Sequence, residues 1–326
     1  MHKILKLVLY LLVLAVLVIA GVLAYLKWAF PQVDAAQNLT IEYTPERIAR
    51  GAYLANHVCV CMDCHSTRDF TKFSGPPLPG TLGKGGDKFD QTLGLPGIFF
   101  AKNITPAGIS RYTDGELFRL ITTGVTKEGR PMFPLMPYPY YGKMDREDIY
   151  DIIAYIRSLP AIANEVPESK ADFPMNFILE TIPQNASLTT RPAKTDQLAY
   201  GAYLTNAAGC IECHTQVDKG QVIPDLVFGG GRVFHFPDGS VVRSSNISPH
   251  PQKGIGTWKE EVFVERFKQY ADSAYIVPTV KQGEFNSIMP WVMYAGMEEE
   301  DLKAIYAYLK TVKPQDISVE KFTRAP

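Results

Sequence analysis

Two short segments of the chain carry residues of the same types at the same spacing. The pattern Cys-x-x-Cys-His is found at Cys61, Cys64 and His65 and again at Cys210, Cys213 and His214. Two cysteines at this spacing can present both thiols to one edge of a porphyrin, where they add to its vinyl groups, and the next residue can direct its imidazole at the iron. The pattern therefore predicts two covalently bound haem c groups, with the two histidines as proximal iron ligands.

A disulfide, a redox-active dithiol or a zinc ion would use the same residue types. A thioredoxin-like dithiol requires a βαβ context, and a zinc site requires a second pair of Cys or His residues nearby. No such pair follows either motif, which favours haem. Four of the five cysteines lie in the motifs, and the fifth, Cys59, is expected to be a buried or unpaired thiol.

The two motifs belong to an internal repeat. Four pairs of segments recur: residues 51–56 as 201–206, residues 103–106 as 246–249, residues 136–137 as 289–290, and residues 144–156 as 297–309. The last two pairs share one offset, 153 residues. A repeat of this length predicts a duplicated domain. We place the first domain at 40–160, a Pro-rich linker at 161–192 and the second domain at 193–318.

Each repeat is predicted to begin with a short helix, over about residues 46–56 and 197–206, that leads into the motif. Long Gly- and Pro-rich stretches such as 75–97 follow, and they suit a compact domain only if a porphyrin supplies the missing core. Each repeat ends in a helix with an apolar stripe, formed by Ile149, Ile152, Ile153 and Ile156 and by Leu302, Ile305, Tyr306 and Leu309. Because few strand signals occur, the predicted fold class is all-α.

An uncharged apolar run occupies residues 7–26. A helix rising about 1.5 Å per residue crosses a hydrocarbon core of about 30 Å over this length. Lys3 and Lys6 precede the run, so the N-terminus is predicted to be cytoplasmic. Residues 1–33 are thus a predicted single-span anchor in the inner membrane, with the soluble part in the periplasm, where bacteria attach haem c. A cleaved signal peptide is the alternative, although its apolar region would have about 7–15 residues.

Overall composition limits the class of partner. The 326 residues carry a formal net charge of −1. A near-neutral chain lacks the basic excess expected of a nucleic-acid-binding protein, so nucleic acid is excluded as an obligate partner. The membrane and redox proteins remain as the predicted partners.

The order of helix, Cys-x-x-Cys-His, Pro-rich loop, Met and closing helix resembles a class I cytochrome c domain, here in tandem. Further motifs are Asn-Ile-Thr-Pro, Gly-Ile-x-x-Tyr/Trp and Pro-Leu-Met-Pro-Tyr-Pro. With them the chain resembles, over about residues 46–313, the cytochrome c subunits of bacterial membrane-bound alcohol, aldehyde and sugar-acid dehydrogenases. Those subunits usually have three haem motifs and a C-terminal amphipathic attachment, whereas this chain has two motifs and an N-terminal apolar run.

The resemblance implies a distal methionine ligand in each domain. The repeated Met-Pro pair assigns this role to Met136 and Met289. In the first repeat Met132 is set aside because it maps onto Phe285, which cannot ligate, and Met144, at the start of the closing helix, is expected to pack as an apolar residue. Met293 and Met297 are the reserves for the second site. The resemblance also implies that a proline carbonyl accepts the proximal imidazole N–H, from Pro76 or Pro77 and from Pro224. Tyr112 and Trp258 are expected either to bind haem propionates or to pack in the core.

These features favour a membrane-anchored di-haem electron carrier without a catalytic residue. Its donor would be linked to a quinol-oxidising complex or a dehydrogenase, and its acceptor would be a terminal oxidase or a soluble cytochrome. A di-haem cytochrome c peroxidase is one alternative, and it would need one iron with an open or displaceable distal ligand. A haem-bearing subunit of a larger respiratory complex is the other.

Overall fold

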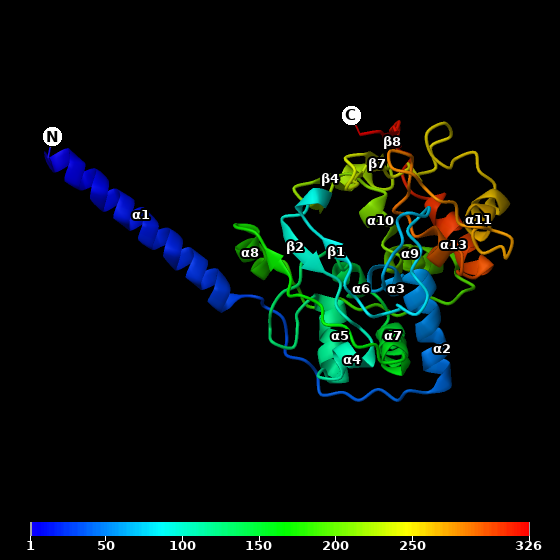
Figure 1. Cartoon of the computed structure of the whole chain (residues 1–326), viewed down its shortest axis with the longest axis horizontal. Coiled ribbons are helices and arrows are strands. Elements are labelled where there is room, and N and C mark those ends of the chain that lie inside the picture. The colour runs from blue at the N-terminus through cyan, green and yellow to red at the C-terminus, as the bar shows by residue number, and fades with distance from the viewer. Residues whose placement is uncertain (1, 326) are drawn as a thin grey trace.

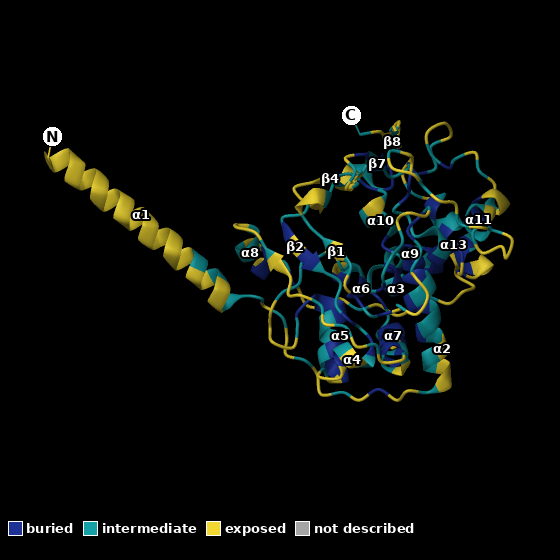
Figure 2. Cartoon of the chain, in the orientation of Figure 1, coloured by how far each residue is buried: buried dark blue, intermediate teal, exposed yellow. Residues whose placement is uncertain are grey.

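The structure is a computed structural model that describes residues 2–325 (Figure 1). Helix α1 (His2–Ala29) extends away from a body that contains all other elements. None of its residues is buried, and Figure 2 shows it exposed along almost its whole length. By length and composition it could cross a membrane or serve as a signal sequence.

We call residues 40–160 the first half and residues 193–318 the second half. The first half begins with α2 (Pro45–Tyr53), where the Thr44 side chain accepts a hydrogen bond from the Arg47 amide. The helix continues as a π-helical turn, η1 (Leu54–Val58), and so confirms the predicted helix over 46–56. The remaining helices are α3 (Cys61–Cys64), η2 (Gln91–Leu93), α4 (Pro106–Ile109), α5 (Asp114–Thr123), α6 (Tyr138–Tyr141) and α7 (Arg146–Ser158).

The second half repeats this order. Its helices are α9 (Gln197–Ala207), α10 (Cys210–Cys213), η4 (Pro224–Leu226), α11 (Glu260–Lys268), α12 (Trp291–Tyr294) and α13 (Glu299–Leu309). The predicted entering and closing helices are therefore present in both halves. Between the halves lie α8 (Met175–Ile178) and η3 (Leu179–Thr181).

The prediction of an all-α fold is wrong in that small antiparallel sheets accompany the helices. Their strands are β1 (Lys88–Phe89), β2 (Gly97–Phe100), β3 (Lys170–Ala171), β4 (Val217–Asp218), β5 (Gln221–Val222), β6 (Val233–His235), β7 (Val241–Arg243) and β8 (Phe322–Thr323). In each half, the chain beyond the closing helix returns and adds a third strand to a hairpin, giving the orders β1-β2-β3 and β6-β7-β8. Strands of two to four residues are too short to show an alternating sequence pattern.

The entering and closing helices of each half cross at a glycine. A Cβ atom on Gly51 of α2 would lie 1.8 Å from the Asp151 carbonyl oxygen of α7. A Cβ atom on Gly201 of α9 would lie 1.9 Å from the Ala304 carbonyl oxygen of α13. Only glycine allows the backbones to approach so closely. The apolar stripes of α7 and α13 are largely buried at these crossings.

The two halves contact each other through a pair of matched hydrogen bonds. The Tyr53 hydroxyl donates to Asp301 Oδ2 at 2.7 Å, and the Tyr203 hydroxyl donates to Asp148 Oδ2 at 2.6 Å. Each tyrosine belongs to the entering helix of one half and each aspartate to the closing helix of the other. Burial, together with the neighbouring carboxylate, raises the pKa of both tyrosines, so the hydroxyls stay protonated and act as donors at neutral pH.

We predict that Gly51→Ala and Gly201→Ala each lower the free energy of unfolding by about 3 kcal/mol or more, because the added methyl group meets a backbone carbonyl that cannot move aside. Denaturant unfolding followed by circular dichroism measures the change. Gly21→Ala is the matched control, since a Cβ atom there has nothing within 4 Å. A wild-type unfolding midpoint for either crossing variant would contradict the prediction.

Candidate haem-binding sites

Each Cys-x-x-Cys-His motif is a single helical turn that follows a sharp change in chain direction. The turn into α3 is made at Val60, with φ 45°, and the turn into α10 at Gly209, with φ 62°. Positive φ is unfavourable for a β-branched residue such as valine. The backbone N–H of His65 donates to the Cys61 carbonyl at 3.0 Å, and that of His214 donates to the Cys210 carbonyl at 2.9 Å. One turn therefore presents two thiols and an imidazole together.

Both motif histidines use Nδ1 to contact a backbone carbonyl. His65 Nδ1 lies 2.7 Å from the Lys102 oxygen, and His214 Nδ1 lies 2.7 Å from the Ser245 oxygen. Such a contact fixes the tautomer and leaves Nε2 for a metal. Burial lowers the pKa of both histidines, which favours the neutral imidazole that coordination requires.

The predicted proline acceptors, Pro76 or Pro77 and Pro224, are therefore wrong. The carbonyls that accept belong to the residues immediately before the repeated Asn-Ile-Thr/Ser-Pro segments. That repeat was visible in the sequence, but its proximity to the imidazoles depends on long loops whose path the sequence does not reveal.

The asparagine of each repeated segment holds this loop in place. Asn246 Oδ1 accepts from the Ser248 amide at 3.0 Å, and its Nδ2 donates to the Gln315 carbonyl at 2.8 Å. Asn103 makes the matching bonds, to the Thr105 amide at 3.0 Å and to the Ile162 carbonyl at 2.8 Å. Each asparagine thus links the carbonyl loop to the chain just beyond the closing helix. In the first half, that chain is the start of the segment predicted as a linker.

A cavity of about 520 Å³ in the second half brings the predicted residues together. Cys210, His214 and Met289 all line it. Of the two reserve methionines, Met297 lines it, whereas Met293 is not among its lining residues. Its walls are mainly apolar, from Ile247, Ile255, Phe263, Phe267, Trp291, Tyr294, Ile305 and Leu309. The volume lies in the range usual for cofactor pockets.

The residues around this cavity fit a haem group. Cys210 and His214 line the cavity and match two of its attachment points, Cys213 belongs to the same helical turn without lining the cavity, and the apolar walls match the porphyrin faces. Lys253, Arg266 and Lys321 also line the cavity and could balance two propionate charges. Trp258, which was expected at a propionate or in the core, lines the cavity as well.

The state of the thiols does not suit a redox dithiol. Burial raises the pKa of Cys61, Cys64 and Cys210 to about 12, so these groups remain thiols at neutral pH, whereas reactive cysteines have a lowered pKa. All five cysteines lie within residues 2–325, and none is in a disulfide. In the same residues, no three His, Cys, Asp or Glu side chains gather as a metal site. Cys59 is buried, as expected, with its Sγ 3.9 Å from Met144 Sδ.

In the first half, Met136 occupies the position that corresponds to Met289. Both are partly buried against the core. The carbonyl of Met136 accepts from the Tyr138 amide at 2.7 Å, and that of Met289 accepts from the Trp291 amide at 2.8 Å. Met144 is completely buried, and its counterpart Met297 exposes only 1% of its surface. Both side chains therefore fit core packing.

Comparison with known proteins agrees with this geometry. Residues 198–313 match the family model described as cytochrome c. The chain contains a cytochrome c domain. A domain of this family implies covalently bound haem c, and it covers the second half, where the cavity lies.

Relatives of the chain are named as cytochrome c subunits of dehydrogenases. The alcohol dehydrogenase (quinone) cytochrome c subunit of Gluconacetobacter polyoxogenes is 25% identical over 86% of this chain and 58% of that subunit. The gluconate 2-dehydrogenase cytochrome c subunit of Pantoea cypripedii is 25% identical over 94% of this chain and 67% of that subunit. A diheme cytochrome c-type protein of Cereibacter sphaeroides is 30% identical over 39% of this chain and 43% of its own length. The chain thus spans a little over half of the first-named relative.

A loop of the first half supports the Met289 segment of the cytochrome c domain. The Ser74 amide donates to Asn286 Oδ1 at 2.9 Å, and the Ser74 hydroxyl donates to the Met289 carbonyl. Asn286 Nδ2 in turn donates to the Phe70 carbonyl at 3.1 Å. No local pattern in the sequence predicts this contact, because the partners lie more than 200 residues apart. The second site therefore depends on the first half for its shape.

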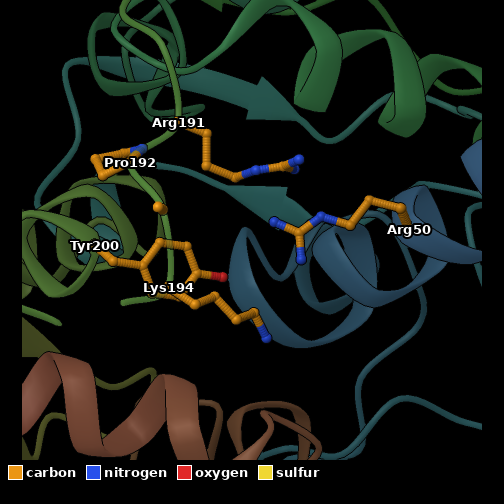
Figure 3. A pocket seen from close by; sticks show the side chains of 6 residues that line it. Arg50, Arg191, Pro192, Lys194 and Tyr200 are labelled. Carbon is orange, nitrogen blue, oxygen red and sulfur yellow. The ribbon is translucent and has the colours of Figure 1, made fainter. Parts of the chain in front are cut away.

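A second cavity, of about 470 Å³, opens at the seam between the halves and is separate from the motifs (Figure 3). Figure 3 shows Arg50, Arg191 and Lys194 around it, with Tyr200 at one side. These cations are already paired, because Arg50 and Arg191 contact the buried Asp148 and Lys194 lies 3.1 Å from the buried Asp301. The cavity is thus a charge-balanced part of the interface.

We predict that Asn246→Ala lowers the free energy of unfolding by about 1–3 kcal/mol, since buried groups at Ser248 and Gln315 lose their partner. Asn103→Ala should lower the free energy of unfolding by a similar amount, because the Thr105 amide and the Ile162 carbonyl lose their partner. Urea unfolding measures both. Asn185→Ala, which removes an exposed bond to the Asp34 amide, is the control and should change stability by less than about 0.5 kcal/mol. Equal effects of Asn246→Ala and Asn185→Ala would show that the asparagine does not hold the loop.

Proposed function

We propose that the chain is a membrane-anchored, periplasmic di-haem c-type cytochrome that transfers single electrons. The observation that carries this proposal is the duplicated arrangement around His65 and His214, each with Nδ1 engaged by a carbonyl and each directly after a helical turn that contains two cysteines. The cavity at the second motif supports it, as does the cytochrome c domain. The first half has the same motif, helix crossing and asparagine contacts, which supports a second haem there.

The residues of each site have separate tasks in this proposal. Bound haem supplies a one-electron couple at its iron. The cysteine pairs would attach the porphyrin edge, and His65 and His214 would be the proximal ligands. Met136 and Met289 would be the distal ligands, and their soft thioether sulfur would favour reduced iron. With a histidine and a methionine as its protein ligands, the iron would be kept from small substrates.

We propose a dehydrogenase as the electron donor, because the relatives are named as subunits of dehydrogenases. The acceptor would be a terminal oxidase or a soluble cytochrome, and a quinol-oxidising complex is the other donor to consider. Co-purification of the detergent-solubilised full chain is the experiment that identifies the partner.

The names of the relatives also favour the second candidate, a haem-bearing subunit of a larger respiratory complex. The two candidates share the same haem chemistry and differ in whether the chain stays bound to its donor. A di-haem peroxidase is disfavoured, because it needs unlike distal sides, whereas the Met-Pro pairs at Met136 and Met289 match in sequence and in their backbone hydrogen bonds.

We predict that the full chain gains the mass of two haem groups and stains for haem on a denaturing gel, since both attachments are covalent. Cys64→Ala and Cys213→Ala should each leave one haem attached by a single thioether and lower the yield of holoprotein. Cys59→Ala is the control and should retain both haems, because this thiol lies outside the motifs. Intact-mass measurement decides the matter, and a gain of one haem or none would refute the di-haem proposal.

We also predict that the oxidised protein shows the weak sulfur-to-iron charge-transfer band in the far red, at the intensity of two sites. Met136→Ala and Met289→Ala should each remove about half of the band and lower the potential of that haem, because reduced iron loses its soft ligand. Met293→Leu is the matched control, since this residue does not line the cavity.

Carbon monoxide binding gives the independent readout. The wild type should not bind it, and the double Met variant should bind it at both irons. A wild type that binds carbon monoxide at one haem would favour the peroxidase. A full band in Met289→Ala would transfer the ligand role to Met297.

A further inference from the structure

A short apolar turn lies beside the end of α1 that is nearest the body (Figure 1). It consists of residues 172–182 and contains α8 and η3. Lys27, in the last turn of α1, forms an ion pair with Glu180 and donates to the Asn176 carbonyl at 3.0 Å. The Lys27 ammonium also lies 5.5 Å from the centre of the Phe177 ring. These contacts fix the turn against the base of α1.

Two large apolar side chains of this turn are exposed, whereas Leu179 of the same turn is buried. Phe173 is 74% exposed and Ile178 is 46% exposed. The rings of Phe173 and Phe177 pack edge to face with centres 6.1 Å apart. Trp28, one residue beyond Lys27, is 86% exposed. Single exposed apolar residues are ordinary, but Phe173, Ile178 and Trp28 lie on two segments that contact each other, and they continue the apolar surface of α1.

The charges of the turn suit the boundary of a bilayer. Residues 172–182 contain two acidic residues and no basic one, and Glu180 is already neutralised by Lys27. Tryptophan is enriched where hydrocarbon meets headgroups, as at Trp28, phenylalanine and aliphatic side chains insert from the apolar face of interfacial segments, and lysines near helix ends extend to the headgroup level. The turn is too short to bind a membrane by itself, so its effect depends on being held next to a span.

We propose that residues 172–182 form a second membrane contact, in which Phe173 and Ile178 enter the lipid interface beside α1. The inference rests on the proposed function, because it takes α1 as the span. The occupant of this surface is the lipid bilayer. The contact would hold the body at a fixed height and tilt over the membrane, because a single helix joined to the body by a short chain would allow both to vary.

The test uses the full chain in nanodiscs of phosphatidylcholine and phosphatidylglycerol, with the photoreactive residue p-benzoylphenylalanine at one position at a time. Position 173 reports on the turn, and position 178 gives a second report should the first variant fold poorly. Position 17, in the middle of α1 and 63% exposed, is the positive control. Position 262, on α11 and 51% exposed, is the negative control, since α11 lies on the side of the body opposite α1 (Figure 1). Mass spectrometry after irradiation detects lipid adducts.

We expect lipid adducts at positions 17, 173 and 178 and none at 262. Adducts at 17 without adducts at 173 and 178 would overturn the second contact and leave the membrane span intact. No lipid adduct at any position would overturn both the second contact and the membrane span. Adducts at 173 that join two copies of the chain instead of a lipid would also overturn the proposal, because the surface would then bind protein. Equal yields of lipid adducts at positions 173 and 262 would also overturn the proposal, because the lipid contact would then not be specific to the turn.

Discussion

In each half the entering and closing helices approach closely where a glycine faces a backbone carbonyl, Gly51 with Asp151 and Gly201 with Ala304. This contact sets the distance and angle between the entering helix and the closing helix. The haem motif follows the entering helix after one left-handed residue, so the same contact determines where the two thiols and the imidazole lie. It also decides which side of α7 and α13 is buried. The loops, which have little regular structure, then pack around this pair of crossed helices.

The second constraint is the seam between the halves. Tyr53 and Tyr203 each reach the buried aspartate of the opposite closing helix, and the basic residues Arg50, Arg191 and Lys194 balance those aspartates. Removing one partner would leave a buried charge unpaired, which is costly. Near this seam the Tyr140 hydroxyl donates to Glu212 Oε1 at 2.5 Å, which links α6 of the first half to the motif of the second. In the proposed function, these bonds hold the two redox sites in one fixed relation.

The halves are matched but not equivalent. The Ser74 loop of the first half supports the Met289 segment, and the described residues give no corresponding support from the second half to Met136. The Met289 carbonyl therefore has a contact from the other half that the Met136 carbonyl lacks, although the second half does contact α6, where Asn206 Nδ2 donates to the Tyr140 carbonyl at 3.0 Å. Such asymmetry is a physical basis on which two otherwise similar haems could differ in potential.

The sequence by itself determined the chemistry and its duplication. The Cys-x-x-Cys-His spacing, the apolar stripes of α7 and α13 and the uncharged run of α1 are local patterns, and local geometry is enough to interpret them. The tertiary structure alone decided the features that join distant segments. The carbonyls of Lys102 and Ser245, rather than those of the predicted prolines, contact the imidazoles. Short strands accompany the helices of an expected all-α fold. Met289 lines the cavity, whereas Met293 is not among its lining residues. Part of the predicted linker packs against the first half and α1. The imidazole–carbonyl contacts join residues 37 and 31 positions apart, and the contact of Lys27 with Glu180 joins residues 153 positions apart, through loops whose path depends on packing rather than on periodicity.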